Sequence, residues 1–150
     1  MKKLLLATLL AAAPLAFAAN DATTNTARNK ENALAFYELV FNQHKVQEAV
    51  DKYIAEPYIQ HNPSVGDGGA AFAAIFIPFL KEHPQSHAEI KRVIAEGDLV
   101  ALHVFIKHSP DERGEAVVDI FRFNDDGKIV EHWDVVQSIP AEMVHKNGMF

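Results

Sequence analysis

Two aspartates, Asp119 and Asp134, are notable because each lies in the middle of a segment of mainly apolar residues. A carboxylate among apolar neighbours is costly unless it is paired with a cation or used in chemistry. One possibility is that these aspartates form ion pairs, for example with Arg92 or Arg122, or lie on a solvated face of a sheet. The other is that one of them acts as a general acid or base in an apolar pocket. The residues alone leave both possibilities open.

Histidines are the next candidates for acid–base or hydrogen-bonding roles. His61 belongs to the segment 58–63, Tyr-Ile-Gln-His-Asn-Pro, and His103 shares a face of its own segment with Ala101 and Phe105. The sequence has no His-Glu-x-x-His run and no carboxylate–histidine set with the spacing of metal ligands. It also has no phosphate-binding loop, nucleophile elbow or dinucleotide fingerprint. We therefore expect no metal and no cofactor.

Alternation along the last two predicted strands sorts their side chains into two faces, because successive residues of a strand point to opposite sides. One face of the last strand carries Val130, His132, Asp134 and Val136. Its other face carries Glu131, Trp133, Val135 and Gln137. In the strand before it, one face carries Val117, Asp119, Phe121 and Phe123. We expect both aspartates on the same side of the sheet, the side that lines a pocket.

The hydrophobic pattern predicts three helices followed by four strands, which must position these residues. Helical spacing of apolar residues predicts helices over 26–42 and 46–54, and a third helix after Gly68-Gly69 that Pro78 kinks or ends early. Alternation predicts strands over 87–95, 99–107, 116–123 and 128–137, with tight turns at 96–98 and 124–127. This order predicts an α+β fold, with the helices packed on one face of a curved, mainly antiparallel sheet and a hollow between the layers.

The first 18 residues differ in composition from the rest. Lys2 and Lys3 precede the apolar run 4–15, and Ala16-Phe17-Ala18 fits a signal peptidase site. This layout predicts a secretory signal peptide over 1–18, a polar lead-in over 19–27 and one domain over 28–150. A membrane anchor is the alternative, but the run is short for a bilayer and polar residues follow it directly. We expect a secreted or periplasmic protein with no membrane attachment after cleavage.

Charge and composition exclude several classes of partner. Removing residues 1–18 takes away two lysines and no acidic residue, so the formal net charge falls from −6 to −8. A chain this acidic has no electrostatic reason to bind nucleic acid or anionic lipid. Cysteine is absent, so the protein has neither disulfides nor a thiolate nucleophile.

The segment 127–137, Gly-Lys-Ile-Val-Glu-His-Trp-Asp-Val-Val-Gln, resembles the closing strand of the SnoaL-like polyketide cyclase family. The segments 58–63 and 119–122 are similar to two further family segments, and the ending 147–150 resembles the branch of predicted aldol-condensation enzymes. The resemblance covers about residues 32–150 and implies the cone-shaped barrel of the nuclear transport factor 2-like superfamily. It also implies that Asp134 is the general acid/base, that His61 lines the same pocket, and that Asp119 and His103 add polar contacts.

From this resemblance we expect an exported SnoaL-like enzyme with cofactor-free acid–base chemistry. The reaction would be an aldol-type condensation or cyclisation, or a related lyase or isomerase reaction, on a small hydrophobic carbonyl compound. Asp134 would move the proton while His61 or His103 hydrogen-bonds the developing oxyanion. Tyr58 and Phe121 would contact the substrate. The alternative is a periplasmic domain of the same fold that binds a small molecule without reacting with it.

The outward face of the last two strands also indicates a partner. This face carries the apolar residues Val118, Ile120, Trp133 and Val135. An apolar patch of this kind is unusual on a solvated surface. We therefore expect a homodimer that forms through this face.

Overall fold

The computed structural model describes residues 15–150, with side chains from residue 23 onward. Most of the predicted signal peptide, residues 1–18, therefore lies outside the described residues. Helix α1 (Leu15–Tyr37) begins within it, and the predicted lead-in at 19–27 is helical. No glycine or proline occurs between Leu15 and Asn42, so nothing in this stretch interrupts the helix. Among the described residues, no helix combines the length and the apolar character that crossing a bilayer requires.

Helices form the layer that covers the sheet. Helix α1 continues directly into the π-helical turn η1 (Glu38–Asn42), and α2 (Val46–Tyr53) and α3 (Gly69–Glu82) follow. The helices predicted over 26–42 and 46–54 are thus present, the first with an earlier start. Helices α2 and α3 approach closely at Gly69, where a Cβ atom would lie 2.7 Å from Val50 Cγ1. A larger residue at this contact would require the Val50 side chain or the helix to shift.

Pro78 lies inside α3 but does not end it, because the helix continues to Glu82. A proline lacks the N–H that would bond to the carbonyl four residues earlier, at Ala74. Both Ala74 and Pro78 are exposed, so water can satisfy that carbonyl. The early end that the proline suggested does not occur.

Five strands form one mixed sheet. Their bounds are β1 (Ile54–Gln60), β2 (His87–Glu96), β3 (Leu99–Lys107), β4 (Glu115–Phe123) and β5 (Ile129–Ser138). The order across the sheet is β1-β5-β4-β3-β2. Strands β2 to β5 form the predicted antiparallel meander, and their ends agree with the prediction within one residue. Strand β1 was not among the four predicted strands, and it pairs in parallel with β5.

One irregularity determines where the side chains of β5 point. Phe123 pairs with Ile129, whereas Arg122 pairs with Glu131, so Val130 is an extra residue in β5. An extra residue of this kind is a β-bulge. Ile129 and His132 are both buried although they are three residues apart, because the bulge reverses the alternation between them.

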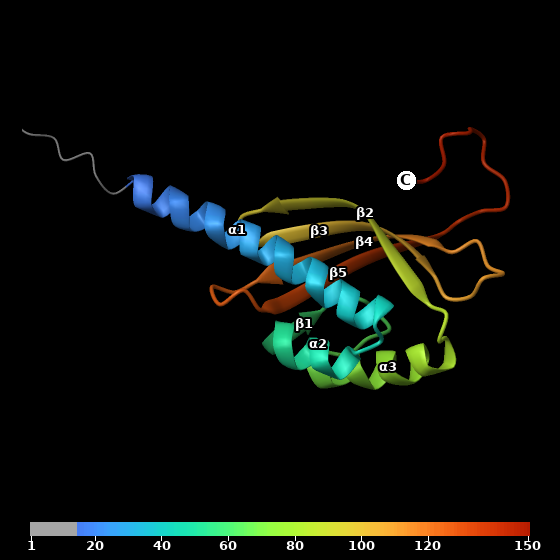
Figure 1. Cartoon of the computed structure of the whole chain (residues 1–150), viewed down its shortest axis with the longest axis horizontal. Coiled ribbons are helices and arrows are strands. Elements are labelled where there is room, and N and C mark those ends of the chain that lie inside the picture. The colour runs from blue at the N-terminus through green and yellow to red at the C-terminus, as the bar shows by residue number, and fades with distance from the viewer. Residues whose placement is uncertain (1–14) are drawn as a thin grey trace, which may run out of the picture.

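The helices lie on one face of the sheet, and α1 runs across it (Figure 1). Buried apolar residues fill the space between the two layers. All four residues predicted for the inward face of β4 are buried: Val117, Asp119, Phe121 and Phe123. The predicted α+β fold, with helices on one face of a mainly antiparallel sheet, is confirmed.

Candidate active site

A cavity of about 520 Å³ lies between the helices and the inward face of the sheet. This volume is in the usual range for small-molecule sites. Six phenylalanines line it: Phe36, Phe41, Phe72, Phe76, Phe79 and Phe121. None of the described residues that line it is a lysine or an arginine. The wall therefore suits an apolar ligand, and its few polar groups determine what chemistry is possible.

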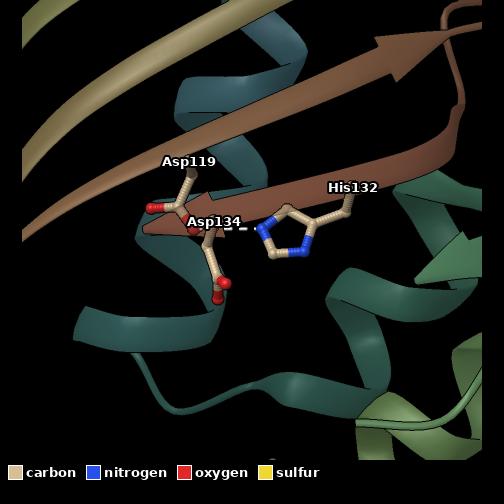
Figure 2. Close-up of side chains that lie close together, drawn as sticks. All are labelled: Asp119, His132 and Asp134. Atoms are coloured by element: carbon tan, nitrogen blue, oxygen red, sulfur yellow. Dashed lines mark hydrogen bonds and ion pairs between the residues drawn. The ribbon is translucent and has the colours of Figure 1, made fainter. Parts of the chain in front are cut away.

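Three polar side chains meet in this cavity: Asp119, His132 and Asp134 (Figure 2). Asp119 on β4 is paired directly with Asp134 on β5, and Phe121 is paired with His132. Residues paired across antiparallel strands point to the same side of a sheet. Each of the three offers a nitrogen or oxygen atom, and these atoms all lie within 4.8 Å of one another. The sheet register thus brings the two predicted aspartates together.

Asp119 and His132 belong to a buried chain of hydrogen bonds. The Tyr37 hydroxyl donates to Asp119 Oδ2 at 2.9 Å, and His132 Nε2 lies 3.0 Å from Asp119 Oδ1. Only 6% of the surface of Asp119 and of His132 is exposed. Burial, together with the charge of Asp119, raises the pKa of Tyr37 well above its ordinary value. The Tyr37 hydroxyl therefore stays protonated and can act as a donor.

The position of one proton follows from this network. Gln60 Oε1 accepts a hydrogen bond from the Asn62 backbone N–H at 2.9 Å, so this atom must be the amide oxygen. The same oxygen lies 2.8 Å from His132 Nδ1, which therefore carries a hydrogen. At 3.0 Å, His132 Nε2 and Asp119 Oδ1 must then share a second proton. Whichever atom holds it, Asp119 and His132 together carry no net charge.

Asp134 is the carboxylate that remains available to a ligand. The Asn62 side chain donates to Asp134 Oδ2 at 2.6 Å. The other oxygen, Oδ1, has no hydrogen-bond partner among the residues that the structure describes, and Asp134 is half-buried. The sequence left open an ion pair with Arg92 or Arg122. Arg122 instead pairs with Asp98 and Glu131, and Arg92 contacts His103. The predicted ion pairs with Arg92 or Arg122 are therefore wrong, and Asp119 pairs with His132 instead.

His61 does not line the cavity, so its predicted place beside Asp134 is wrong. It is exposed, its Nε2 lies 2.9 Å from Glu131 Oε1, and its ring stacks on Trp133 at 4.8 Å. The reason is alternation: Gln60 at the end of β1 points inward, and the next residue points outward. Glu131 and Trp133 are on the outward face of β5, as predicted.

His103 also lies outside the cavity, on the outward face of β3. It pairs across the sheet with Val118, whereas its neighbour Leu102 pairs with the inward Asp119. Its ring stacks on Phe150 at 5.3 Å. The predicted polar contact from His103 is therefore wrong.

The two predicted substrate-contacting aromatics have different positions. Phe121 lines the cavity and stacks on the His132 ring at 5.0 Å. Tyr58 is 1% exposed and is not among the residues that line the cavity. Its hydroxyl accepts a hydrogen bond from the Gln60 side chain at 3.1 Å. Tyr58 thus holds Gln60, which in turn contacts His132. The prediction that Tyr58 contacts substrate is wrong.

Sequence reasoning missed four residues of the site: Tyr37, Gln60, Asn62 and His132. His132 was detectable, because it shares the predicted inward face of β5 with Asp134. Tyr37, Gln60 and Asn62 lie on other elements, and only the fold brings them to β4 and β5.

The same three side chains could also bind a divalent cation. The sequence predicted no metal-ligand set, but spacing along the chain does not reveal that Asp119, His132 and Asp134 converge. Two carboxylates and one imidazole nitrogen are suitable ligands for such an ion. An ion there would replace the proton that His132 shares with Asp119.

Comparison with known proteins identifies the fold. The model of the SnoaL-like domain family matches residues 33–132. The crystal structure of a protein from Bacillus cereus that is described as a predicted polyketide cyclase is similar to this chain. The two sequences are 22% identical and the TM-score is 0.62, over 73% of this chain and 74% of that one. A predicted ketosteroid isomerase from Kribbella flavida is 19% identical with a TM-score of 0.61, over 82% of this chain and 87% of that one.

A third solved structure has the same fold. It is a nuclear transport factor 2-like protein of unknown function from Mesorhizobium loti, 20% identical with a TM-score of 0.62, over 76% of this chain and 94% of that one. Among curated proteins, none matches this sequence significantly. The predicted nuclear transport factor 2-like fold is confirmed.

Proposed function

The chain belongs to the SnoaL-like domain family, and on this basis we propose that it is an enzyme that moves protons on a small hydrophobic carbonyl compound without a cofactor. The reaction is an aldol-type condensation or cyclisation, or a related lyase or isomerase reaction. The observation that carries the proposal is the half-buried Asp134 in a cavity lined by six phenylalanines, with an oxygen that has no hydrogen-bond partner among the described residues. Two structural neighbours, a predicted polyketide cyclase and a predicted ketosteroid isomerase, support this class of chemistry.

Asp134 is the base in this proposal. Asn62 fixes one of its oxygens, so the other is held in a defined direction toward the ligand. Positioning a general base in this way contributes about 10²- to 10⁴-fold to a proton-transfer rate. No lysine or arginine is among the described lining residues, so no cation neutralises the carboxylate.

Tyr37 supplies a hydrogen bond to the developing oxyanion. Without ligand, the Tyr37 hydroxyl donates to Asp119. A ligand oxygen that gains negative charge is a stronger acceptor, and it takes over this hydrogen bond. Donors already placed in a site that excludes water stabilise such an oxyanion strongly.

The chemistry balances without a further reactant. Asp134 takes a proton from the carbon next to the carbonyl, the C–H electron pair forms a C=C bond, and the carbonyl π pair moves to oxygen. In an isomerisation, Asp134 returns the proton to a different carbon. In an aldol cyclisation, the new nucleophilic carbon attacks a second carbonyl carbon, and the resulting alkoxide takes the proton from Asp134. Both routes restore the carboxylate.

Hydrogen–deuterium exchange at carbon tests the proposal without knowledge of the natural substrate. In D₂O, the protein should accelerate exchange of the methyl protons of 2-acetylnaphthalene, which proton NMR measures. Asp134→Asn keeps the shape but removes the base, so it should lower the exchange rate constant by about 10²- to 10⁴-fold. Ligand affinity and the thermal unfolding midpoint should persist.

Glu131→Gln is the matched control, because it removes a carboxylate from the opposite face of the same strand. This variant should exchange as fast as the unmodified protein. Exchange in Asp134→Asn at the unmodified rate would show that Asp134 is not the base. Binding of the ketone without any acceleration would favour the alternative, a non-catalytic binding domain of the same fold.

We also propose that the protein is exported to the periplasm or secreted. Lys2 and Lys3, the apolar run and Ala16-Phe17-Ala18 support this. Intact mass measurement of the native protein should show an N-terminus at Ala19 or Asn20. Soluble protein that retains Met1 would contradict export.

A further inference from the structure

The cavity has a second polar end that the proposed reaction does not use. His108 and Glu115 line the same cavity as Asp119 and Asp134. Glu115, at the start of β4, lies on the same face of that strand as Asp119. Four residues of strand span about 13 Å, so β4 separates the Cα atoms of the two polar ends by about this distance. Val117 lies between them and also lines the cavity.

His108 is held in one orientation at this second end. Its Nδ1 lies 3.0 Å from the hydroxyl of the buried Ser86, and Phe79 packs edge-on against its ring at 4.9 Å. Burial lowers the pKa of His108, so the ring is neutral at neutral pH and carries one N–H. Glu115 Oε2 lies 3.9 Å from Nε2. A carboxylate favours the proton on the nitrogen that faces it, so Nε2 is the donor and Nδ1 accepts from Ser86.

The gap between His108 and Glu115 fits one hydroxyl group. A separation of 3.9 Å is too long for a direct hydrogen bond. An oxygen about 2.8 Å from both atoms would accept from His108 Nε2 and donate to Glu115 Oε2. Glu115 Oε1 already accepts from the Ser138 hydroxyl at 3.3 Å, which leaves Oε2 for a ligand. Glu115 would repel an anionic group, and a carbonyl has no proton to donate to it.

We propose that His108 and Glu115 form a hydroxyl-binding subsite, and that the substrate is an elongated, mainly apolar ketone with a hydroxyl or phenol at the end remote from its carbonyl. This rests on the proposed function, because the carbonyl is placed at Asp134. The six phenylalanines that line the cavity favour flat, unsaturated rings. His108 and Glu115 are then specificity-determining residues that take no part in proton transfer.

A matched pair of ketones tests the subsite. The probes are 2-acetylnaphthalene and 2-acetyl-6-hydroxynaphthalene, which differ only in the remote hydroxyl, and calorimetry measures their affinities. The unmodified protein should bind the hydroxylated ketone about tenfold more tightly, since a hydrogen bond to a charged group is involved. Glu115→Leu and His108→Leu should each reduce this preference to less than about twofold, with the affinity for 2-acetylnaphthalene retained. Asp134→Asn and Glu131→Gln should keep the tenfold preference.

A measurement on the unmodified protein guards against variants that fail to fold. The hydroxylated ketone should shift the imidazole proton signals of His108 in NMR spectra, and 2-acetylnaphthalene should not. Equal affinities for the two ketones, or an undiminished preference in both leucine variants, would overturn the subsite. Failure of either ketone to bind up to its solubility would overturn the inferred size and shape class. A tenfold preference without proton exchange would contradict the proposed function but support the subsite.

Discussion

Two histidine–carboxylate pairs lie on opposite faces of the same sheet and have nearly the same geometry. Inside, His132 Nε2 lies 3.0 Å from Asp119 Oδ1; outside, His61 Nε2 lies 2.9 Å from Glu131 Oε1. Their surroundings differ. The inner side chains are 8% and 9% exposed, and the outer side chains are 42% and 18% exposed. Similar contact distances therefore do not imply similar roles.

The difference lies in what else each carboxylate contacts. The outer Glu131 also accepts a hydrogen bond from Arg122. The hydrogen bond with His61 is the largest cause of the lowered pKa of Glu131, and the one with Arg122 is the next largest. The inner pair has no arginine or lysine nearby among the described lining residues, and its second carboxylate, Asp134, keeps one oxygen for a ligand. The outer pair is an ordinary surface ion pair, whereas the inner one belongs to a site that can bind and react.

The largest expected effect separates the two pairs by stability. His132→Leu leaves Asp119 buried without its partner, which should lower the free energy of unfolding by about 3–5 kcal/mol. His61→Leu removes the equivalent partner on the outer face and should cost less than about 1 kcal/mol. Urea unfolding of both variants measures these losses.

The double variant Asp119→Asn/His132→Leu is the control for this comparison. It removes the buried carboxylate as well, so part of the stability lost in His132→Leu should return. Equal losses in His132→Leu and His61→Leu would mean that burial does not distinguish the two pairs.

The next effect concerns assembly. We propose a homodimer that forms through the outward face of β4 and β5, where Val118 is 40% and Val135 is 71% exposed. Val135→Glu should convert the dimer to a monomer, because it places a charge in the apolar contact. Light scattering at micromolar concentration measures the mass. A monomeric unmodified protein would contradict the proposal. A dimer would mean that the side chains of His61 and Glu131 are less exposed to solvent in the assembled protein than in the single chain.

The smallest expected effects are on the pH dependence of stability, which differs between His108 in the cavity and Glu131 on the outward face. Burial lowers the pKa of His108, so the folded chain binds this proton less readily than the unfolded chain. Its contribution to stability is constant above about pH 6.5 and falls as the pH decreases below that value. The lowered pKa of Glu131 acts in a different range: its contribution is present above about pH 4.3 and is lost as the pH falls further.

Urea midpoints from about pH 7 down to about pH 3 resolve these two ranges. His108→Gln should flatten the upper range only. Glu131→Gln should reduce the loss in the lower range without abolishing it, because backbone hydrogen bonds also lower the pKa of Glu112. A change in the upper range for Glu131→Gln would contradict this separation.

Most of the fold could be predicted because local signals agree with it. Strands β2 to β5 alternate with a period of two, and Gly97 and Gly127 have positive φ in the turns that the sequence indicated. Strand β1 could not be predicted in full, since Pro57 interrupts its pattern and its partner β5 is more than 70 residues away. Long-range pairing of this kind leaves no local trace in the sequence.

Strand alternation predicted part of the site. Alternation correctly placed Asp119 and Asp134 on one face. It gave no direction for His61, which follows β1 in a loop, and the resemblance placed this histidine in the pocket. Tyr37 lies on an amphipathic helix, where its hydroxyl is indistinguishable from any other part of an apolar face. Its partner Asp119 is 82 residues further along the chain.

The bulge at Val130 sets the register of β5, the strand that carries His132 and Asp134. If Val130 instead paired with Arg122, with no bulge, Asp119 would pair with Trp133, and β5 would present Glu131 and Trp133 to the cavity in place of His132 and Asp134. Point substitutions can thus alter the chemistry one side chain at a time, whereas a one-residue slip of β5 against β4 would exchange the whole set at once. Divergence within such a scaffold should therefore tolerate replacements in β5 far more readily than changes that shift the register of β5 against β4.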